Sequence, residues 1–280
     1  MPEQLGCAND KTSHRGGTGK MKIRVLGCHG SQLPGFNTTS FLINGNILLD
    51  AGSVTSVLTI EEQINIDYIF VTHPHIDHVR DVMFLADNIF YTKGKESPLV
   101  VISTSHVIEI FKKHLFNGVV WPDFSVIPDK DNPVVKFTEI RQGETISLAG
   151  LSVTPIGVSH AVETVSYLVQ AKEGAVIFVG DTGPTEEIWQ IASKTNGLKA
   201  VFVETSFSDA MKDVAYISGH LTPASLKAEL KKLGSSLATV YLYHMKLHDL
   251  ETIKKEVKLL MNRNIRVLKD GQVLKIGTPS

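Results

Sequence analysis

His73-Pro74-His75-Ile76-Asp77-His78 is the stretch that decides the fold of this chain. Three histidines and one aspartate fall within six residues, directly after the apolar, β-rich run 68–72. In an extended backbone the first two histidines point to the same side, and a turn into a following helix would bring the aspartate and the last histidine to the same place. Imidazole and carboxylate ligands together suit Zn, Mn or Fe. The stretch therefore predicts a metal site at the end of a strand, with enough ligands for two ions.

Three polar patches follow other apolar, strand-like runs. They are Val158-Ser159-His160 after residues 151–156, Gly180-Asp181-Thr182 after residues 174–179, and His244 after residues 239–243. Each has a plainer alternative when it is taken singly, as a turn between glycines or as a half-buried histidine. Loops at the carboxyl ends of strands gather to build sites in layered α/β proteins. The joint placement of the patches therefore predicts that they supply the missing ligands.

The order His-x-His-x-Asp-His, then His, Asp and His, resembles the metallo-β-lactamase superfamily over residues 22–276. The resemblance implies an α+β fold, a four-layer αββα sandwich, with two divalent metal ions at one edge, and we expect Zn, with Mn or Fe as alternatives. It implies that one ion is held by His73, His75 and His160, that the second is held by Asp77, His78 and His244, and that Asp181 bridges them. Asp50 matches the family's first motif, in which an aspartate supports a ligand loop, although a turn aspartate before Gly52 is an equal alternative. Thr182 is expected to support the ligands in the same way.

Further segments resemble the class II 3',5'-cyclic-nucleotide phosphodiesterases. They are Gly27-Cys28-His29-Gly30-Ser31 with residues 33–40, residues 180–184 followed by Trp189, residues 203–207, residues 218–223, and His244-Met245-Lys246. Ile76 departs from the family's usual Leu, which is nearly isosteric, and residues 79–82 lack the small residue often found there. The resemblance implies a homodimer. It also implies that a hydroxide held between two ions cleaves the 3' ester of cyclic AMP or cyclic GMP to give the nucleoside 5'-monophosphate.

Glu204 and His220 are interpreted as catalytic residues, and Asp77 is counted as catalytic as well as a ligand. The Glu and His also resemble the pair that acts beside the metals in tRNA 3'-processing endoribonucleases, the alternative within this superfamily. His220 would stabilise the pentacoordinate state or protonate the leaving oxygen, and Glu204 would orient it. A plainer role for His220 is to lead into a helix, since Thr222 and Pro223 predict a helix start.

The composition agrees with a compact enzyme. In 280 residues, a hydrophobic fraction of 42% is enough for a sizeable core. A net charge of −1 indicates no nucleic-acid surface, which argues against the endoribonuclease. The expected partner, a small cyclic nucleotide, is what the resemblance to the phosphodiesterases implies. Residues 1–20 contain no signal or membrane-spanning run, and we expect a disordered tail or an added extension before a single domain over 21–280. Cys7 and Cys28 predict free thiols and a reducing compartment, so we expect a cytoplasmic protein.

The periodicity predicts two β-rich blocks with helices between them. Strands are expected at 23–26, 39–43, 47–50, 68–72, 99–103, 135–139, 145–148, 151–156, 166–169, 175–179, 200–204 and 239–243, and helices at 80–90, 106–115, 186–195, 223–233 and 249–261. Residues 265–276 alternate around Asp270-Gly271, which predicts a hairpin. Strands that meet first as hairpins and then alternate with helices are typical of two stacked αβ layers.

Substrate contacts are less defined by the sequence. His29, Asn37 and Thr38 fall in loops where the resemblance implies substrate, but an ordinary loop histidine and turn chemistry explain them equally well. Trp121 and Phe124 could stack on a base, or they could simply pack. Base recognition therefore stays unassigned.

Overall fold

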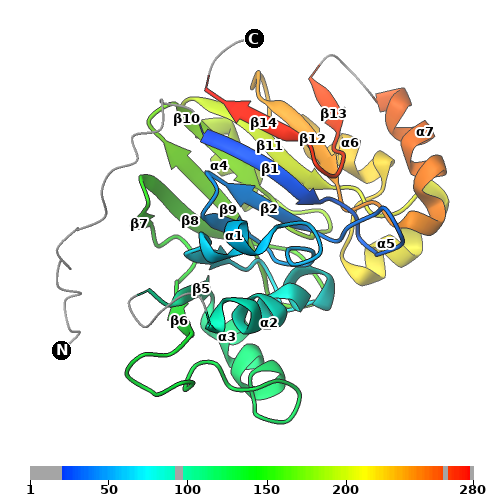
Figure 1. Cartoon of the computed structure of the whole chain (residues 1–280). Helices are drawn as coiled ribbons and strands as arrows, with labels where there is room; N and C mark the ends of the chain where they lie inside the picture. The colour runs from blue at the N-terminus through cyan, green and yellow to red at the C-terminus, as the bar shows by residue number, and fades with distance from the viewer. Residues whose placement is uncertain (1–20, 92–96, 261–263, 278–280) are drawn as a thin grey trace.

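Two seven-stranded sheets face each other in the computed structural model, which describes residues 21–91, 97–260 and 264–277 (Figure 1). The first sheet has the order β14 (Val273–Ile276), β1 (Met21–Gly27), β2 (Ser40–Ile43), β3 (Ile47–Leu49), β4 (Tyr68–Phe70), β5 (Leu99–Ser103) and β6 (Val135–Glu139). The second has the order β13 (Ile265–Val267), β12 (Thr239–Tyr243), β11 (Leu198–Glu204), β10 (Gly174–Phe178), β9 (Thr164–Ala171), β8 (Leu151–Val158) and β7 (Ile146–Leu148). The expected tail, residues 1–20, lies outside the described residues.

Each sheet is antiparallel in one half and parallel in the other. Strands β14, β1, β2 and β3 pair antiparallel, and β3 to β6 pair parallel. The second sheet repeats the plan, because β7 to β10 pair antiparallel and β10 to β13 pair parallel. The expected order of hairpins followed by strand–helix alternation is therefore confirmed.

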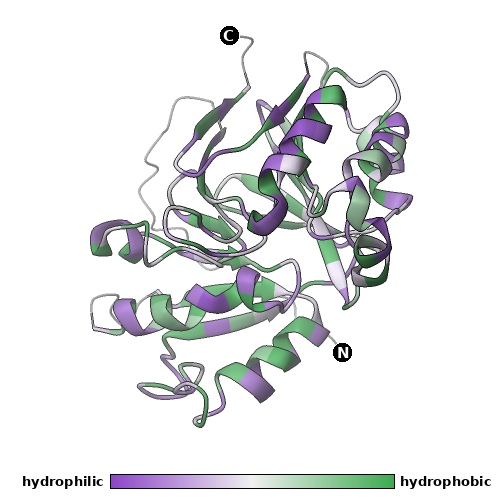
Figure 2. Cartoon of the chain, turned by 90° about the vertical axis from the view of Figure 1, so that its right-hand side faces the viewer, coloured by the Kyte–Doolittle hydropathy of each residue, from purple (hydrophilic) through white to green (hydrophobic). Residues whose placement is uncertain are grey.

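Helices cover the outer face of each sheet. They are α1 (Ile60–Ile64), α2 (Ile76–Phe90), α3 (Ser105–Ile110) with a π-helical turn at Phe111–Leu115, α4 (Glu187–Lys194), α5 (Lys212–Ser218), α6 (Pro223–Lys231) and α7 (Leu250–Leu260). Buried residues of α2 and α3 form one core with the first sheet, and those of α4, α6 and α7 form another with the second. Figure 2 shows the corresponding pattern, with largely hydrophobic strands between helices of mixed hydropathy. Together these layers confirm the αββα sandwich.

The central core lies between the two sheets. Its aromatic centre joins Phe41 of the first sheet to Phe178 and Phe202 of the second, with ring centroids 5.2 and 5.5 Å from Phe41. Burying a side chain of this kind stabilises the fold by about 1.5–3 kcal/mol. Because this core holds the two sheets face to face, strand ends from both sheets meet at one edge.

The hairpin expected over residues 265–276 is wrong. β13 pairs parallel with β12 in the second sheet, whereas β14 pairs antiparallel with β1 in the first. The turn at Asp270 and Gly271 carries the chain from one sheet to the other, and the Gly271 N–H donates to the Val25 carbonyl at 2.8 Å. The alternation of apolar and polar residues predicts that each strand has one buried face, but it does not predict which strand pairs with it.

Helix boundaries differ from expectation in one place that matters for the site. Helix α2 begins at Ile76 rather than at residue 80, so Asp77 and His78 lie in its first turn. Helix α6 begins as expected, with the Thr222 side chain accepting from the Ser225 N–H and Pro223 in the first turn. Helices α1 and α5 were not anticipated, because both are short. Within the described residues, no helix has the length and hydropathy needed to cross a bilayer.

Candidate metal centre

Seven side chains meet where strand ends from both sheets come together. They are His73 and His75 after β4, Asp77 and His78 in the first turn of α2, His160 after β8, Asp181 after β10, and His244 after β12. All seven are residues that the sequence predicts as ligands; the structure brings them together, and their binding of metal stays a prediction. Each follows or begins an element whose apolar residues are fixed in a core, so the backbone on which each ligand stands is rigid.

The first cluster contains His73, His75, His160 and Asp181, whose ligand atoms all lie within 4.8 Å of one another. His160 Nε2 lies 3.4 Å from His75 Nδ1, and His73 Nε2 lies 3.7 Å from Asp181 Oδ2. His160 is turned this way because its Nδ1–H donates to the Gly219 carbonyl at 2.8 Å. Gly219 ends α5 in the left-handed conformation, and a Cβ there would lie 2.9 Å from His160 Cα.

The second cluster contains Asp77, His78 and His244. His244 Nε2 lies 3.2 Å from Asp77 Oδ2 and 3.1 Å from His78 Nε2. Asp181 Oδ2 is 3.4 Å from His78 Nε2 and 3.3 Å from His244 Nε2, so the same oxygen borders both clusters. Asp181 is the residue that the sequence predicts as the bridging carboxylate, and that role stays a prediction.

A second set of groups fixes the ligand histidines. The His78 Nδ1–H donates to Asp50 Oδ2 at 2.7 Å, and Asp50 also accepts from the Thr72 hydroxyl at 2.9 Å. Thr72 Oγ1 in turn lies 3.0 Å from His73 Nδ1. With Nδ1 engaged in this way, Nε2 is left to face the centre, which is the usual arrangement for metal-binding histidine. Asp50 thus contacts His78 directly and reaches His73 through Thr72, and its predicted role in supporting the ligands stays a prediction.

The donor set fits divalent cations. His73 Nε2 and Asp181 Oδ1 are buried and have no hydrogen-bond partner within the described part of the chain. A buried polar atom without a partner costs about 1–3 kcal/mol, and a bound cation would remove that cost. Burial and the neighbouring His78 hold the pKa of His73 well below its usual value. Burial acts to raise the pKa of Asp181, but His244 and His78 outweigh it and lower that pKa. Both groups are therefore in the deprotonated form that binds metal.

Two of the four described non-glycine residues with positive φ lie at the same place. His244 has φ of 65° and Asp50 has φ of 55°, in a region that non-glycine residues rarely adopt. Gly52 lets its loop approach the start of α2, because a Cβ there would lie 1.9 Å from the Asp77 carbonyl oxygen. The fold maintains these costly conformations where they aim side chains at the centre.

Glu204 and His220 lie together beside the two clusters. His220 Nδ1 is 3.0 Å from Glu204 Oε1, and the backbone N–H groups of Leu221 and Thr182 donate to the same oxygen. The His220 ring is 4.9 Å from that of His160 and also lies near Asp181 and His244. Burial acts to lower the pKa of His220, but the Glu204 carboxylate outweighs it and raises that pKa. The Glu204 carboxylate therefore favours the protonated form of the His220 imidazole beside the centre.

Ser206 is a functional candidate that the sequence analysis missed. Its hydroxyl donates to Glu204 Oε2 at 2.7 Å and lies 2.9 Å from His244 Nδ1 and 3.2 Å from His220 Nδ1. It therefore links the Glu204–His220 pair to a ligand of the second cluster. The sequence could have indicated Ser206, because it lies two residues after Glu204 and residues two apart in an extended backbone point to the same side. Thr182, the other expected support, acts through its backbone N–H to Glu204 and its hydroxyl to the Gly183 carbonyl.

The three candidate substrate residues have structural partners instead. His29 Nδ1 lies 3.4 Å from Asp270 Oδ1, the Asn37 side chain donates to the Leu26 carbonyl, and Thr38 hydrogen-bonds to Ser53. None of the three belongs to the clusters described above, so their contact with substrate stays a prediction. Trp121 and Phe124 pack against the helix α2 aromatics Phe84 and Phe90.

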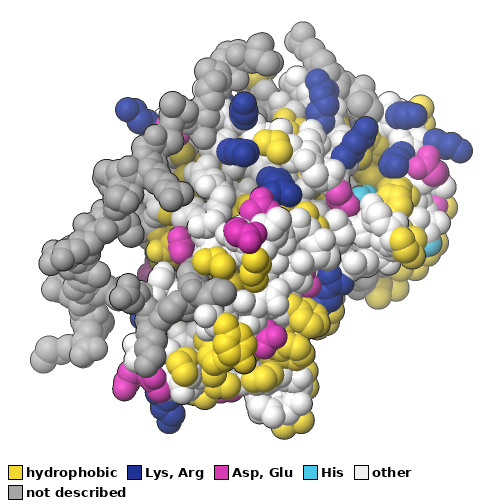
Figure 3. Space-filling view, viewed as in Figure 1, with side chains coloured by type: hydrophobic (Ala, Val, Ile, Leu, Met, Phe, Trp, Pro, Cys, Tyr) yellow, Lys and Arg dark blue, Asp and Glu magenta, His cyan; other side chains and the backbone are white. Residues whose placement is uncertain are grey.

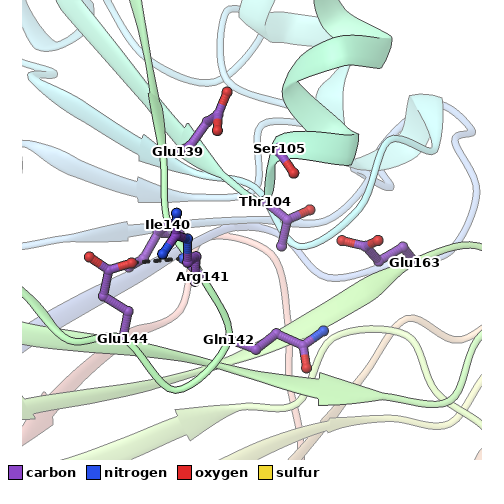
Figure 4. A pocket seen from close by; sticks show the side chains of 8 residues that line it. All are labelled: Thr104, Ser105, Glu139, Ile140, Arg141, Gln142, Glu144 and Glu163. Atoms are coloured by element: carbon purple, nitrogen blue, oxygen red, sulfur yellow. Dashed lines mark hydrogen bonds between the residues drawn. The ribbon is translucent and has the colours of Figure 1, made fainter. Parts of the chain in front are cut away.

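A polar pocket of about 860 Å³ opens at the end of β5 (Figure 4). Its lining is Thr104, Ser105, Glu139, Ile140, Arg141, Gln142, Glu144 and Glu163. Glu163 lies in the loop that carries His160, and β5 is the neighbour of β4, which leads to His73. The buried Thr104 hydroxyl has no hydrogen-bond partner among the described residues. The pocket is thus lined mainly by polar and charged groups, one of which, Glu163, shares a loop with His160.

Two curated proteins that resemble this chain carry the same kind of name. A 3',5'-cyclic-nucleotide phosphodiesterase 1 of Saccharomyces cerevisiae is 25% identical over 214 residues, covering 69% of this chain and 56% of that protein. A 3',5'-cyclic-nucleotide phosphodiesterase of Schizosaccharomyces pombe is 26% identical, covering 65% of this chain and 58% of that protein. The chain therefore spans a little over half the length of either relative.

Solved structures and a family model define the fold. The structure of unliganded yeast PDE1 superposes with a TM-score of 0.77 at 18% identity, covering 91% of this chain and 99% of that one. Human tRNase Z, short form, superposes with a TM-score of 0.68 at 15% identity, with the same coverage. A family model described as a beta-lactamase superfamily domain matches residues 46–245, which include all seven clustered ligands. The chain belongs to the beta-lactamase superfamily and has the metallo-β-lactamase fold.

Proposed function

We propose that this protein is a metal-dependent phosphodiesterase that hydrolyses the 3' ester of 3',5'-cyclic nucleotides to nucleoside 5'-monophosphates. The observation that carries the proposal is Asp181 Oδ2, which borders two ligand clusters, with the Glu204–His220 pair beside them. The names of the two yeast relatives support the phosphodiester substrate. Their greater length leaves the substrate a proposal for this chain.

The chain's own groups divide the work. Divalent metal ions bound at the clusters, for which we propose Zn, would neutralise phosphoryl charge and lower the pKa of water. Glu204 accepts the Nδ1–H of His220, which leaves the other ring nitrogen to donate to the leaving 3'-oxygen. The Glu204 carboxylate raises the pKa of His220, which favours the protonated form that a general acid needs. The polar pocket at the end of β5 is the proposed place for the base and ribose.

The test is turnover of a panel of cyclic nucleotides by the full chain with Zn or Mn added. We expect conversion to the 5'-monophosphate, and the matched Asp181→Ala variant should lose it. Failure to turn over any member of the panel, with metal bound, would remove the proposal.

The alternative is an endoribonuclease of the tRNA 3'-processing type. The fold similarity to human tRNase Z favours it, whereas the net charge of −1 does not supply the basic surface that RNA needs. Cleavage of a structured RNA without turnover of any cyclic nucleotide would select this alternative.

Three other expectations remain proposals. They are a homodimer, a cytoplasmic location and a single domain over residues 21–280. Sedimentation of the purified chain would test the first, and limited proteolysis would test the third.

A further inference from the structure

A second pocket, of about 610 Å³, lies beside β12 and helix α7, and its lining includes Tyr243 and Met245, the chain neighbours of His244, but not His244 itself. It is enclosed by the loop after β1, the ends of β12 and β13, and helix α7. Its volume falls within the range of small-molecule sites, about 300–1,000 Å³. Nothing in the proposed reaction uses it.

The pocket combines an apolar floor with a cationic rim. The apolar side chains are Phe36, Leu242, Met245, Leu250, Val267 and Leu268. The cationic ones are Lys254, Lys258, Arg266 and Lys269, and Asp270 is the one carboxylate in the lining. Figure 3 shows Lys and Arg side chains gathered on the part of the surface where β13, β14 and α7 lie.

The positive charge is only weakly compensated. Asp270 is already engaged, since it accepts from the backbone N–H groups of Cys28 at 3.0 Å and Asn37 at 2.8 Å. Lys254 pairs at 3.0 Å with Glu251, which is exposed. Lys258 and Lys269 have no acidic partner among the residues that the structure describes. A pocket with this excess of positive charge attracts an anion.

A metal ion is the less suitable occupant. Cys28, His29 and Asp270 do come within ligand distance of one another. However, the four cations around them repel a divalent ion, and the thiol hydrogen-bonds to Asp270 at 3.2 Å. The observations therefore favour an anionic ligand.

We propose that this pocket binds a small organic phosphomonoester, with its phosphate on the Lys258–Arg266 side and its apolar or aromatic body on the floor. A phosphomonoester carries about −1.5 to −2 charges at neutral pH, which matches several cations. Arg and Lys donors suit phosphate oxygens. Cys28, which lines the pocket, is also bonded to a candidate metal ligand, because the His244 N–H donates to the Cys28 carbonyl at 2.7 Å. The proposal concerns binding alone and does not depend on the proposed reaction.

The test is calorimetric titration of the full chain after metal removal, so that the reaction site contributes no turnover. The probes are AMP, phenyl phosphate and inorganic phosphate. We expect saturable binding of at least one phosphomonoester, and inorganic phosphate should bind at least about tenfold more weakly because it lacks a body for the apolar floor.

Two variants and one control locate the binding. Lys258→Met and Arg266→Met should each weaken binding by about tenfold, since each removes a hydrogen bond to a charged group. Both side chains are exposed, so folding should be retained, and a melting curve checks this. Lys255→Met, on an exposed part of the same helix outside the pocket, should leave affinity unchanged.

The outcomes separate the sources of the ligand. Binding of AMP alone identifies a nucleotide, and binding of phenyl phosphate as well identifies a general organic phosphate site. The proposal is overturned if no phosphomonoester binds saturably, if inorganic phosphate binds equally well, or if the two variants match the Lys255→Met control.

Discussion

Asp81 and Asp181 are both buried, with exposed fractions of 2% and 1%, yet their surroundings differ completely. Asp81 Oδ2 accepts from the backbone N–H groups of Val54 and Thr55 at 2.6 and 2.7 Å, and Oδ1 accepts from Arg80. Asp181 faces imidazoles at 3.3 to 3.7 Å, and its Oδ1 has no hydrogen-bond partner in the described ranges. A buried carboxylate whose lone pairs are filled by the backbone fastens a loop. A buried carboxylate that is surrounded by histidines and has an oxygen without a hydrogen-bond donor is suited to bind a cation.

The largest effect is expected from Asp181→Ala. Turnover should fall at least about a thousandfold, because the loss of metal forfeits several kcal/mol of transition-state stabilisation. Metal content, measured by elemental analysis of the dialysed protein, should fall with it. If metal content and turnover both stay unchanged, Asp181 is not a metal ligand and does not differ from Asp81 in the way we describe.

His220→Ala should reduce turnover by about 10²–10⁴-fold, the usual contribution of a general acid, while metal content stays intact. The reason is that Glu204, not a ligand cluster, holds the Nδ1 of His220. His114→Ala, an exposed histidine remote from the clusters, is the matched control. A drop in metal content would make His220 a ligand, a role that its closeness to Asp181 and His244 also allows.

Asp81→Ala should act on stability instead. We expect the free energy of unfolding to fall by about 3 kcal/mol, because buried donors of residues 54 and 55 lose their acceptor. Asp181→Ala should cost less, since it removes a charge that lacks backbone donors. Urea titrations of both variants without metal give the comparison, and the reverse order would contradict it.

Asp270→Asn should give the smallest effect, about 1 kcal/mol of stability at neutral pH. Burial acts to raise the pKa of Asp270, but hydrogen bonds with His29 and Asn37 outweigh it and lower that pKa below 3.8. A lowered pKa in the folded state stabilises the fold above the unfolded pKa, and that contribution is lost as pH falls through the folded pKa. The difference between wild type and variant should therefore shrink below pH 3.8. Chemical denaturation at several pH values measures this difference in unfolding free energy. If the difference does not change with pH, Asp270 does not stabilise its loop as an ionised carboxylate in the way that Asp81 does.

The candidate ligands and the supporting Asp50 were predictable from the sequence, whereas Ser206 was not. His73, His75 and Asp181 follow recognisable strands, and the chemistry of each ligand type is local. Ser206 acts by touching Glu204, His220 and His244 at once, a property that only distance in space defines. The destination of residues 265–276 was mispredicted for the same reason, since pairing depends on which neighbour the fold supplies.

By itself, the sequence determined the apolar periodicity, the ligand types and their order after strands, because these depend on neighbours in the chain. The tertiary structure decided how Asp181 Oδ2 lies between two clusters, how Glu204 raises the pKa of His220, and how Asp270 joins the loop after β1 to the turn between the sheets. Those features depend on distances and burial between segments far apart in sequence. Electrostatic interaction and desolvation are set by such distances, so they exist only after the two sheets have packed together.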